Sequence, residues 1–584
     1  MSTTFERVAK IFKNEMAPAN WIESAFANIG NSILPAVTST DNGKILSVDN
    51  GKWTAKTPFG LPYVTPEMFS SIADMYTFAK TNGKPVFISE DITSDSEIVI
   101  KADTFGFDGA KITAPGFSID TACTLEGISF VCSASPSGDD EDILLGIYTH
   151  DCTVENCSFA FSTDNGKALA IKGSSARITI EKCEFNKCST NFTGCDFVTV
   201  RNCVFNMGYV NTGHECIQFT AKTPGIIDCN QFYNSENDFI DLYSAGSDCV
   251  ITGNTFDGCH SHNGIELKTT IKATGGSSDD LGWCRRNIIS GNHFKNLVAG
   301  SGGIYAFISI VAVKDADIED SVTYYPGETI VENNIFEKCS TEVASGVYFF
   351  AVNVCARNVI VKNNIADISE NTSSGRTACI YIGENAADQS AAFWKSSQNI
   401  IVDSNILGGN SYGVSVGSAK GIKISNNKGL SGHALKRFIS LAGTISDIKV
   451  IANECNIGTY VSFAFLHCGA ALTDFDFSRN STDSSMAITT TVVRGKISDN
   501  IFSRAGVGLD TPGMNSTSLL ISNNIFNSTS WAIFAQNNTF SNTVIIGNSA
   551  PSGKIIRSLT AISGAPVMLA NVINNAENND IRTT

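Results

Sequence analysis

A short phrase recurs along most of the chain and constrains the fold more than any other feature of the sequence. It consists of two alternating β-type residues, then Asn or Cys, and often one further residue followed by Phe, as in VENCSF, ISGNHF and ISNNIF. The anchor residues of this phrase are, in chain order, Cys157, Cys183, Cys203, Asn230, Asn254, Asn292, Asn334, Asn364, Asn405, Asn427, Asn453, Asn480, Asn500, Asn524 and Asn548. Most neighbouring anchors are about 20 to 27 residues apart, which is typical of one coil of a β-solenoid. The repeat therefore predicts an all-β solenoid.

A second strand lies between successive anchors. It has the form Gly-apolar-x-apolar, as in NGIELK, SGVYFF and YGVSVG. Alternation with a period of two places successive side chains on opposite faces of a strand. Each coil is therefore expected to contribute at least two short strands, each with one face toward an apolar interior.

The anchor residues are expected to point inward at a bend of each coil. An Asn amide can donate to the Asn of one neighbouring coil and accept from the other, which satisfies a buried polar group along a ladder. Cys at the first three anchors fits the same stack as a small apolar residue. The 36 Phe residues suit stacking along the interior. The 18 cysteines include no C-x-x-C pair, so packed free thiols are expected rather than disulfides or a metal site.

The charge and hydropathy of the chain argue against two classes of partner. The formal net charge is −16, and no basic stripe is present, whereas a phosphate backbone requires a basic surface. The longest apolar stretch, around GGIYAFISIVAV, is too short to span a bilayer, and the first residues lack the apolar segment of a secretory signal. We expect no nucleic-acid partner, no membrane insertion, and synthesis in the cytoplasm.

Both ends of the chain depart from the repeat. Residues 1–60 contain an amphipathic helical stretch and then a segment whose DNG turns predict a hairpin. Residues 65–82 predict a helix with Thr65 as its N-cap, and strands follow it. These breaks predict an N-terminal module at 1–60, a capping region at 61–130, the solenoid at 131–550, and a C-terminal cap or assembly element at 551–584.

The second strands, aligned on their inward apolar residues, place a group of acids on one outer surface. The inward column is expected to be Leu169, Ile217, Ile240, Ile265, Ile304, Val347 and Ile380. The next residues, facing solvent, are then Ala170, Gln218, Asp241, Glu266, Tyr305, Tyr348 and Tyr381. Because rungs repeat about every 4.8 Å, these columns form one continuous surface. Glu215, Asp238, Asp241 and Glu266 should converge on it.

Four carboxylates on adjacent rungs repel one another, and glycoside hydrolysis is a chemistry that needs such a group. It uses one protonated carboxyl as the acid and one ionised partner as the base or nucleophile. The rung spacing is compatible with both the retaining and the inverting arrangement. We therefore predict Glu215, Asp238, Asp241 and Glu266 as catalytic residues. The alternative is a solvated face in which Lys172 and Lys268 pair with the acids.

The predicted substrate-binding residues surround this surface. Three anchor intervals beside it are long, and long insertions on one stretch of a solenoid usually build a binding wall. Aromatic rings with an apolar face and a polar tip suit sugar rings, and basic or turn residues can hold their hydroxyl groups. The predicted set is Lys268, Tyr243, Tyr305, Tyr348, Tyr381, Trp283, Trp394, His260 and His262. The alternative is a purely structural role, in which the rings pack the loops onto the solenoid and the histidines are ordinary turn residues.

Several segments resemble those of known families. The segment ILPAVTSTDNGKILSVDNGKWTAKTP resembles a small module found in tail fibres and spikes of tailed bacteriophages. A helix leading into narrowing strands and coils resembles pectin-lyase-like right-handed parallel β-helices, which include phage tailspikes. Asp238-x-x-Asp241, with Glu215 one coil earlier, resembles the acidic trio of tailspikes that hydrolyse lipopolysaccharide O-antigen. The sequence has no convincing match to the His-Gly and Arg-x-Lys motifs of polygalacturonases, which argues against pectin as the substrate.

The resemblance implies a complete set of expectations. The fold would be a right-handed parallel β-helix with a small α/β N-terminal region, assembled as a homotrimer. The protein would belong to a phage virion, where residues 1–60 would join a tail or baseplate protein. It would bind and cleave a bacterial surface polysaccharide, O-antigen or capsule, without a metal or other cofactor.

Two alternatives remain open at this stage. In a polysaccharide lyase, Asp238, Asp241 and Glu266 would hold Ca²⁺, and Lys268 or Arg285 would abstract the proton alpha to a uronate carboxylate. In a receptor-binding spike, the same surface would bind a glycan without cleaving it.

Overall fold

The computed structural model describes residues 45–49, 52–56, 61–107, 109–133, 143–161, 169–174, 176–209, 215–243, 246–260, 262–271, 284–299, 304–314, 327–341, 348–368, 377–383, 397–409, 412–430, 435–456, 464–503, 507–527, 531–551, 554–558, 564, 566–569 and 571–573. The chain forms two compact units, Met1–Ile88 and Ser89–Thr584. The predicted amphipathic helix within residues 1–44 lies outside the described residues.

The first unit contains a hairpin and a short helical segment. Strands β1 (Ile45–Asp49) and β2 (Lys52–Lys56) pair antiparallel around the second DNG turn, which confirms a hairpin there. The predicted single helix over 65–82 is instead a 3-10 turn, η3 (Pro66–Met68), followed by α3 (Ile72–Asn82). Ser71, rather than Thr65, caps the α-helix by accepting from the backbone N–H of Asp74 at 3.1 Å. Strand β3 (Val86–Ile88) follows.

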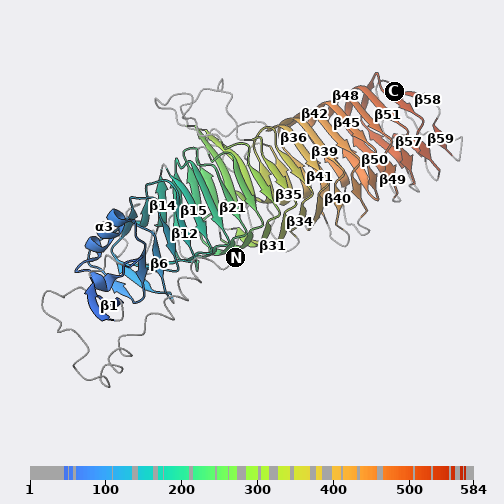
Figure 1. Ribbon diagram of the computed structural model, residues 1–584. Coiled ribbons are helices and arrows are strands. Elements are labelled where there is room, and N and C mark those ends of the chain that lie inside the picture. Colours follow the sequence, from blue (N-terminus) through green and yellow to red (C-terminus); the bar gives the residue numbers. More distant parts are fainter. Residues whose placement is uncertain are drawn as a thin grey trace. The chain divides into compact units, whose positions relative to one another are not determined.

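The second unit is a right-handed parallel β-helix built from three long sheets, as predicted (Figure 1). Sheet 1 consists of β4 (Ile92–Thr93), β7 (Lys111–Ala114), β10 (Ser129–Cys132), β13 (Ser158–Phe161), β16 (Glu184–Asn186), β19 (Val204–Asn206), β22 (Gln231–Ser235), β25 (Thr255–Cys259), β28 (His293–Ala299), β31 (Ile335–Thr341), β34 (Ile365–Ile368), β37 (Ile406–Gly409), β40 (Lys428–Gly429), β43 (Glu454–Cys455), β46 (Ser481–Thr482), β49 (Ile501–Phe502), β52 (Ile525–Phe526), β56 (Ser549–Ala550) and β59 (Val572–Ile573).

Sheet 2 carries the predicted acids. It consists of β5 (Ile98–Ile100), β8 (Phe117–Ile119), β11 (Ile143–Ile147), β14 (Leu169–Ser174), β17 (Ser189–Thr193), β20 (Ile217–Thr220), β23 (Ile240–Tyr243), β26 (Ile265–Ile271), β29 (Ile304–Lys314), β32 (Tyr348–Val354), β35 (Thr377–Ile382), β38 (Tyr412–Val416), β41 (Arg437–Leu441), β44 (Ala464–Cys468), β47 (Ser485–Ile488), β50 (Val507–Pro512), β53 (Trp531–Gln536) and β57 (Lys554–Ser558).

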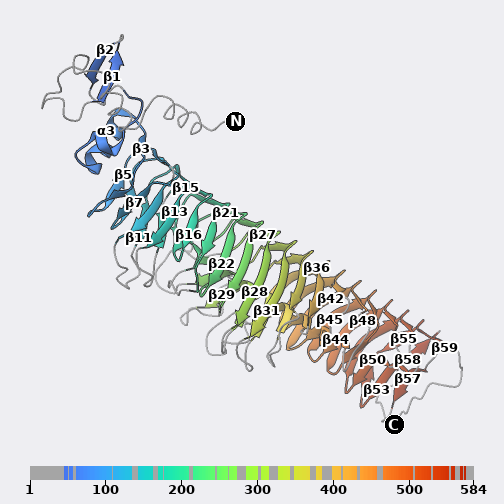
Figure 2. The same cartoon turned by 90° about the horizontal axis from the view of Figure 1, so that it is seen from below.

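Sheet 3 completes each coil, so that a coil contains three strands where the sequence predicted at least two (Figure 2). It consists of β6 (Thr104–Gly106), β9 (Thr124–Glu126), β12 (Cys152–Glu155), β15 (Arg177–Glu181), β18 (Phe197–Arg201), β21 (Gly225–Asp228), β24 (Cys249–Thr252), β27 (Ile288–Ser290), β30 (Ile330–Glu332), β33 (Ile360–Lys362), β36 (Ser397–Asp403), β39 (Ala419–Ser425), β42 (Thr444–Ile451), β45 (Ala471–Ser478), β48 (Thr491–Ser498), β51 (Asn515–Ser522), β54 (Thr539–Ser541), β55 (Val544–Ile546) and β58 (Val567–Leu569).

The predicted asparagine ladder runs along the bend between sheets 3 and 1. Asn364 is typical of it: its Nδ2 donates to Oδ1 of Asn405 at 2.9 Å and to the carbonyl of Val331 at 3.0 Å. Its own Oδ1 accepts from both the Nδ2 and the backbone N–H of Asn334, each at 3.0 Å. Every polar atom of the side chain is therefore satisfied within the buried stack.

The residue before each anchor makes this bend possible. These residues have φ between 50° and 66° in the left-handed region, and they include Cys229, Asn333, Asn363 and Ser404. One such residue bends the chain sharply, so that the strand of sheet 1 follows the strand of sheet 3 with only a short connection. Asn and Asp adopt this conformation more readily than most other residues.

Stacked rings and thiols fill the interior next to the ladder. The Phe side chains that follow the anchors stack from coil to coil, as in the pairs Phe185–Phe205 at 4.4 Å and Phe232–Phe256 at 4.8 Å between ring centroids. The 17 described cysteines are free, and all of them except Cys229 are buried. The predicted packing role of Cys157, Cys183 and Cys203 is confirmed by their burial.

The coil pattern extends further toward both ends than the sequence indicated. At the C-terminal end, β57, β58 and β59 pair with the coil before them, and the ladder continues from Asn548 to Asn571 at 3.1 Å. The expectation that the repeat ends at residue 550 is therefore wrong. Toward the N-terminal side, β4, β7 and β10 already pair in register, so regular coils begin within the region 61–130.

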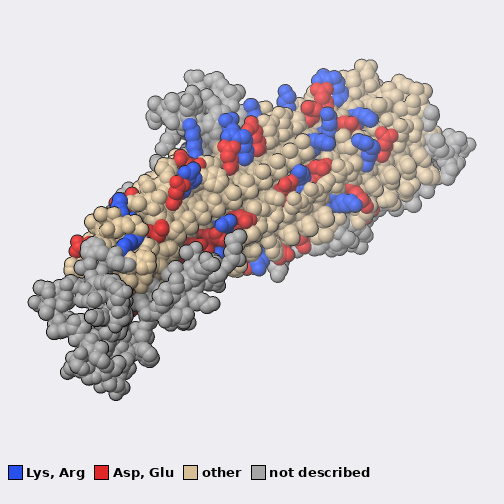
Figure 3. All heavy atoms as spheres, viewed as in Figure 1, with Lys and Arg blue, Asp and Glu red and all other residues tan. Residues whose placement is uncertain are grey.

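The surface charge is mixed on the face shown in Figure 3, where Lys and Arg lie among Asp and Glu. Two bidentate pairs are typical: Arg286 with Asp248 at 2.6 Å and Arg494 with Asp474 at 2.7 Å. In the part of the chain that the structure describes, no helix is both long enough and apolar enough to cross a membrane.

Candidate functional site

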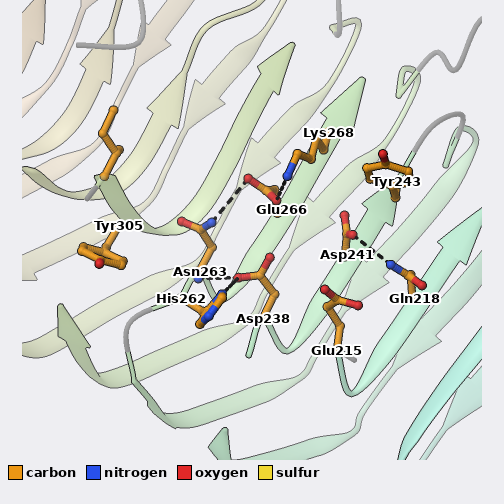
Figure 4. A pocket seen from close by; sticks show the side chains of 11 residues that line it. Glu215, Gln218, Asp238, Asp241, Tyr243, His262, Asn263, Glu266, Lys268 and Tyr305 are labelled. Atoms are coloured by element: carbon orange, nitrogen blue, oxygen red, sulfur yellow. Dashed lines mark hydrogen bonds and ion pairs between the residues drawn. The ribbon is translucent and has the colours of Figure 1, made fainter. Parts of the chain in front are cut away.

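The acids converge on the outer face of sheet 2, where β20, β23 and β26 lie side by side. The register pairs Gln218 with Asp241 and Asp241 with Glu266. Adjacent strands of a sheet are about 4.8 Å apart, so these side chains form one column. The sequence alignment predicted this column. Glu215 and Asp238 come just before β20 and β23, and they lie beside it (Figure 4).

A pocket of about 370 Å³ opens over this column. Its lining residues are Glu215, Gln218, Asp238, Asp241, Tyr243, His262, Asn263, Glu266, Lys268, Ile304 and Tyr305. Asp238 and Asp241 are 5% and 4% exposed, so the acids at the base of the pocket are largely removed from water. The structure thus brings together all four predicted acids, together with Tyr243, His262, Lys268 and Tyr305 from the predicted substrate-binding set.

Asp241 is held by a chain of amides that runs along the column. Asn191 on β17 donates through Nδ2 to Oε1 of Gln218 at 2.5 Å, and Gln218 donates through Nε2 to Oδ2 of Asp241 at 3.3 Å. The other oxygen of Asp241, Oδ1, is buried and has no hydrogen-bond partner. A buried carboxyl with a free oxygen favours its neutral, protonated form, because a charge there would be poorly solvated.

Asp238 has the opposite environment. Its Oδ1 accepts from the backbone N–H of Asn263 at 2.6 Å, and Nδ1 of His262 lies 3.6 Å from the same oxygen (Figure 4). Hydrogen bonds to a carboxylate favour its ionised form. Asp238 and Asp241 lie three residues apart in one short segment, yet their hydrogen-bond environments differ.

Asn263 connects three successive coils at this point. Besides its contact with Asp238, its Nδ2 donates to Oε1 of Glu266 at 3.5 Å, and its Oδ1 accepts from the backbone N–H of Ala306 at 2.9 Å. Glu266 is held from the other side by Lys268, whose Nζ lies 3.4 Å from Oε2. Lys268 also lies over the ring of Tyr243, 5.9 Å from its centroid.

Burial and mutual repulsion shift the titration of the group. Burial, followed by the charge of Asp238, raises the pKa of both Glu215 and Glu266 to about 7. Burial, followed by the charges of Glu266 and Glu215, raises the pKa of Asp241 well above its ordinary range. The hydrogen bond to Asp238 raises the pKa of His262. Near neutral pH the group therefore holds protons that ordinary carboxylates would have released.

The predicted tyrosine ladder is wrong in register. Ile265 pairs with Ile308 rather than Ile304, so Ser309 and then Asn353 continue the column beyond Glu266. Tyr305 pairs with Phe349, and Tyr348 with Ile304. Tyr381 does occupy the column, opposite Asn353, but it is 6% exposed and stacks on Phe350 at 4.7 Å. Of the three tyrosines, Tyr305 alone lines the pocket.

The early part of the predicted alignment is also corrected. Ile171, not Leu169, leads through Thr190 to Ile217, so that Lys172 and Asn191 precede Gln218 in the outer column and Ala170 does not. The sequence analysis missed the coil of β17, because its STNFT segment lacks the Gly-apolar-x-apolar phrase.

Other predicted site residues lie apart from the pocket or outside the described residues. His260 packs against Tyr209 with the two rings tilted and their centroids 4.6 Å apart, its Nδ1 lies 3.7 Å from Glu236, and it does not line the pocket. Arg285, a candidate base of the lyase hypothesis, bridges to Gly327 at the edge of sheet 3 and also lies outside the pocket lining. Trp283 and Trp394 lie outside the described residues.

The site includes two residues that the sequence analysis did not predict as functional. Gln218 and Asn263 orient the acids through hydrogen bonds. Gln218 stood in the aligned outer column, and an amide beside stacked carboxylates was the available signal for it. Among the described residues, no group of three His, Cys, Asp or Glu side chains is arranged to hold a metal ion.

Comparisons with known proteins give structural similarity at low identity. No protein-family model and no curated protein matches the sequence. Among solved structures, the chain is similar to the A-module of mannuronan C-5 epimerase AlgE6 from Azotobacter vinelandii, with 13% identity, a TM-score of 0.33, and coverage of 69% of this chain and 93% of that chain.

Two further solved structures have comparable values. One is the catalytic unit of a GH87 α-1,3-glucanase from Streptomyces thermodiastaticus, with 12% identity, a TM-score of 0.36, and coverage of 69% of this chain and 68% of that chain. The other is a mutant tailspike protein of E. coli bacteriophage HK620 in complex with a pentasaccharide, with 12% identity, a TM-score of 0.31, and coverage of 80% and 74%. Values this low assign neither a family nor a function to the chain.

Proposed function

We propose that the protein hydrolyses glycosidic bonds of a polysaccharide in the acidic pocket of sheet 2. The observation that carries the proposal is the contrast between Asp241 and Asp238 in one pocket. Asp241 is buried with Oδ1 free, whereas Asp238 accepts from Asn263 and faces His262. Glycoside cleavage requires one protonated carboxyl and one ionised partner, and in this proposal Asp241 and Asp238 fill these two roles.

The roles follow from these environments. Asp241 is the general acid: it donates its proton to the glycosidic oxygen as the bond to the anomeric carbon breaks. Asp238 is the ionised partner, which either activates the attacking water or bonds to the anomeric carbon until water displaces it. In both routes water supplies the new hydroxyl group. If Asp238 bonds to the sugar, Asp241 takes the other proton of the water and is restored directly; if Asp238 activates the water, Asp238 takes that proton, and exchange with solvent resets both carboxyls.

Glu215 and Glu266 flank this pair. Their negative charge, when ionised, keeps the proton on Asp241 and stabilises the positive charge that develops on the sugar ring. Glu266 is fixed between Asn263 and Lys268, which suits a positioning role, whereas Glu215 lies beside Asp238 in the pocket lining.

We further propose that the polysaccharide is a bacterial surface glycan and that the protein is the tailspike of a bacteriophage. This finer proposal is supported by the resemblance of the DNG-containing segment before residue 60 to phage tail modules and by the Asp238-x-x-Asp241 pattern with Glu215. It includes a homotrimer and attachment to the virion through residues 1–60. A monodisperse monomer by light scattering would contradict the trimer, and loss of folding on deletion of residues 1–60 would contradict the module.

The experiment that tests the function is incubation of the full chain with O-antigen and capsular polysaccharides of candidate bacteria, followed by mass spectrometry of the products. Hydrolysis gives fragments whose masses include one added water, without new absorbance in the near ultraviolet. Fragments with an unsaturated uronate, formed only without chelator, would instead identify a calcium-dependent lyase. Binding without fragments would identify a receptor-binding spike.

A further inference from the structure

The charges that face the pocket are strongly unbalanced. The acids are Glu215, Asp238, Asp241 and Glu266, and the basic groups are Lys268 and His262. Both basic groups are already engaged, Lys268 with Glu266 at 3.4 Å and His262 with Asp238 at 3.6 Å. A ligand that enters the pocket therefore meets a surplus of carboxyl groups.

These carboxyl groups can accept hydrogen bonds from a ligand. Oδ1 of Asp241, a side chain that is 4% exposed, is buried without a partner at the base of the pocket. Gln218 fixes this orientation, because its amide holds the other oxygen at 3.3 Å. A hydroxyl or amide N–H of a sugar can donate to such an oxygen, and when Asp241 carries its proton the same group can donate to a sugar oxygen.

A ligand carboxylate has the opposite effect. It adds a negative charge to a group of acids that are largely removed from water, where charges interact more strongly than in solvent. Lys268 could oppose that charge only by leaving Glu266, which would then be a buried carboxylate without its cation.

We propose that the sugar unit bound in this pocket is uncharged, so that the protein cleaves its polysaccharide at a neutral residue and not at a uronate or another acidic sugar. The inference rests on the proposed function and narrows its substrate class. It also separates the hydrolase from the lyase hypothesis, since a uronate lyase must place a carboxylate at the reacting carbon.

The test uses matched pairs of polymers. Each probe is a uronate-containing bacterial polysaccharide together with its carboxyl-reduced form, in which every uronate has become the neutral sugar, and neutral O-antigens are included. Binding is measured by retardation of the full chain in gels that contain each polymer, and cleavage by mass spectrometry of the same mixtures. Asp510→Asn is the control variant, because Asp510 lies in the same outer column of sheet 2, and its Oδ1 is also buried without a partner, but it lies outside the pocket lining.

We expect the chain to bind and cleave the neutral and carboxyl-reduced polymers. The native uronate form should retard the chain at least about tenfold less, because an interaction that shifts a pKa by one unit changes an equilibrium constant tenfold. The double variant Glu215→Gln/Asp241→Asn should reduce this difference between the two forms, whereas Asp510→Asn should retain it. Cleavage at a uronate residue would overturn the inference and leave the hydrolase proposal to be judged by the products. If the chain neither binds nor cleaves any of these polymers, that result contradicts both the neutral-sugar inference and the proposed hydrolase function.

Discussion

Asp241 lies directly opposite Glu266 on the neighbouring strand, and its Oδ1 is buried without a hydrogen-bond partner. Parallel pairing in register places the two carboxyls on adjacent rungs, so they repel each other when both are ionised. This relationship ties the chemistry of the pocket to the repeat itself. Each coil supplies one side chain to the column, and the stacking of the coils sets their spacing.

Asn263 is expected to be a positioning residue for the acids. Asn263→Ala removes the side-chain contacts with Glu266 and Ala306 but keeps the backbone N–H that binds Asp238. We expect kcat to fall by about tenfold or more, with a smaller change in KM, because the acids lose their geometry rather than their identity. Asn263→Gln should be little more active than Asn263→Ala, because the longer side chain places its amide group differently. An unchanged kcat and pH profile in Asn263→Ala would contradict the positioning role.

The pH dependence of activity should follow the protons held by the group. Burial raises the pKa of Glu215 and Glu266 to about 7 and that of Asp241 well above its ordinary range, while Asp238, His262 and Lys268 face them. A general acid must be protonated, so kcat should decline as the pH rises past the range in which the group loses its proton. Glu266→Gln removes one negative neighbour and should move that decline to lower pH. If kcat of this variant declines over the same alkaline pH range as that of the wild type, Glu266 does not influence the pKa of the general acid.

The same shifts predict how stability depends on pH. The folded-state pKa of Glu215 and Glu266 lies near 7, above the usual glutamate pKa of 4.5, so the folded state binds more protons than the unfolded state between these values. The free energy of unfolding should therefore fall as the pH rises from about 4.5 to about 7. The double variant Glu215→Gln/Glu266→Gln should lose this part of the slope. Denaturation at pH 5 and pH 7.5 measures the difference, and equal slopes in the two proteins would contradict it.

The asparagine ladder is expected to carry much of the stability of each coil. Asn364→Ala leaves the backbone N–H of Asn334 without its acceptor and removes the side-chain donor to the carbonyl of Val331, whereas the Oδ1 of Asn405 keeps only the backbone N–H of residue 364 as its donor. Each buried group left unpaired costs about 1–3 kcal/mol, so the denaturant midpoint should fall clearly. The control is Asn456→Ala, whose exposed side chain makes a single contact with Glu454 at 3.4 Å. Equal midpoints in the two variants would show that the ladder is not a main source of stability.

The sequence predicted those features that depend on spacing alone. The ladder and the column from Gln218 to Glu266 follow from a repeat of nearly constant length, and both are present. The tyrosine register failed because β29 is 11 residues long and almost continuously apolar. A shift of four residues keeps the same face of a strand, so the apolar pattern fits Ile304 and Ile308 equally well, and only pairing with β26 decides between them.

The directions of the turn side chains could not be predicted from the sequence pattern, for a different reason. His260 and His262 are two residues apart, yet His262 faces Asp238 while His260 packs against Tyr209. The conformation of the turn sets these directions, and no periodicity describes it. The hydrogen bonds of Asn263 to neighbouring coils depend in the same way on how the coils stack.

The most direct test of the proposed active site is a comparison of fragment release by the wild type, Asp241→Asn, Asp238→Asn and Asp510→Asn from one polysaccharide that the wild type cleaves. The two pocket variants keep the size of the side chain and remove the titratable group, so the fold should survive and glycan binding should persist. We predict a loss of about two or more orders of magnitude in cleavage for Asp241→Asn and Asp238→Asn, which is the usual scale for removing an acid or base, and wild-type cleavage for Asp510→Asn. Wild-type turnover in both pocket variants would contradict the assignment and show that the active site lies elsewhere.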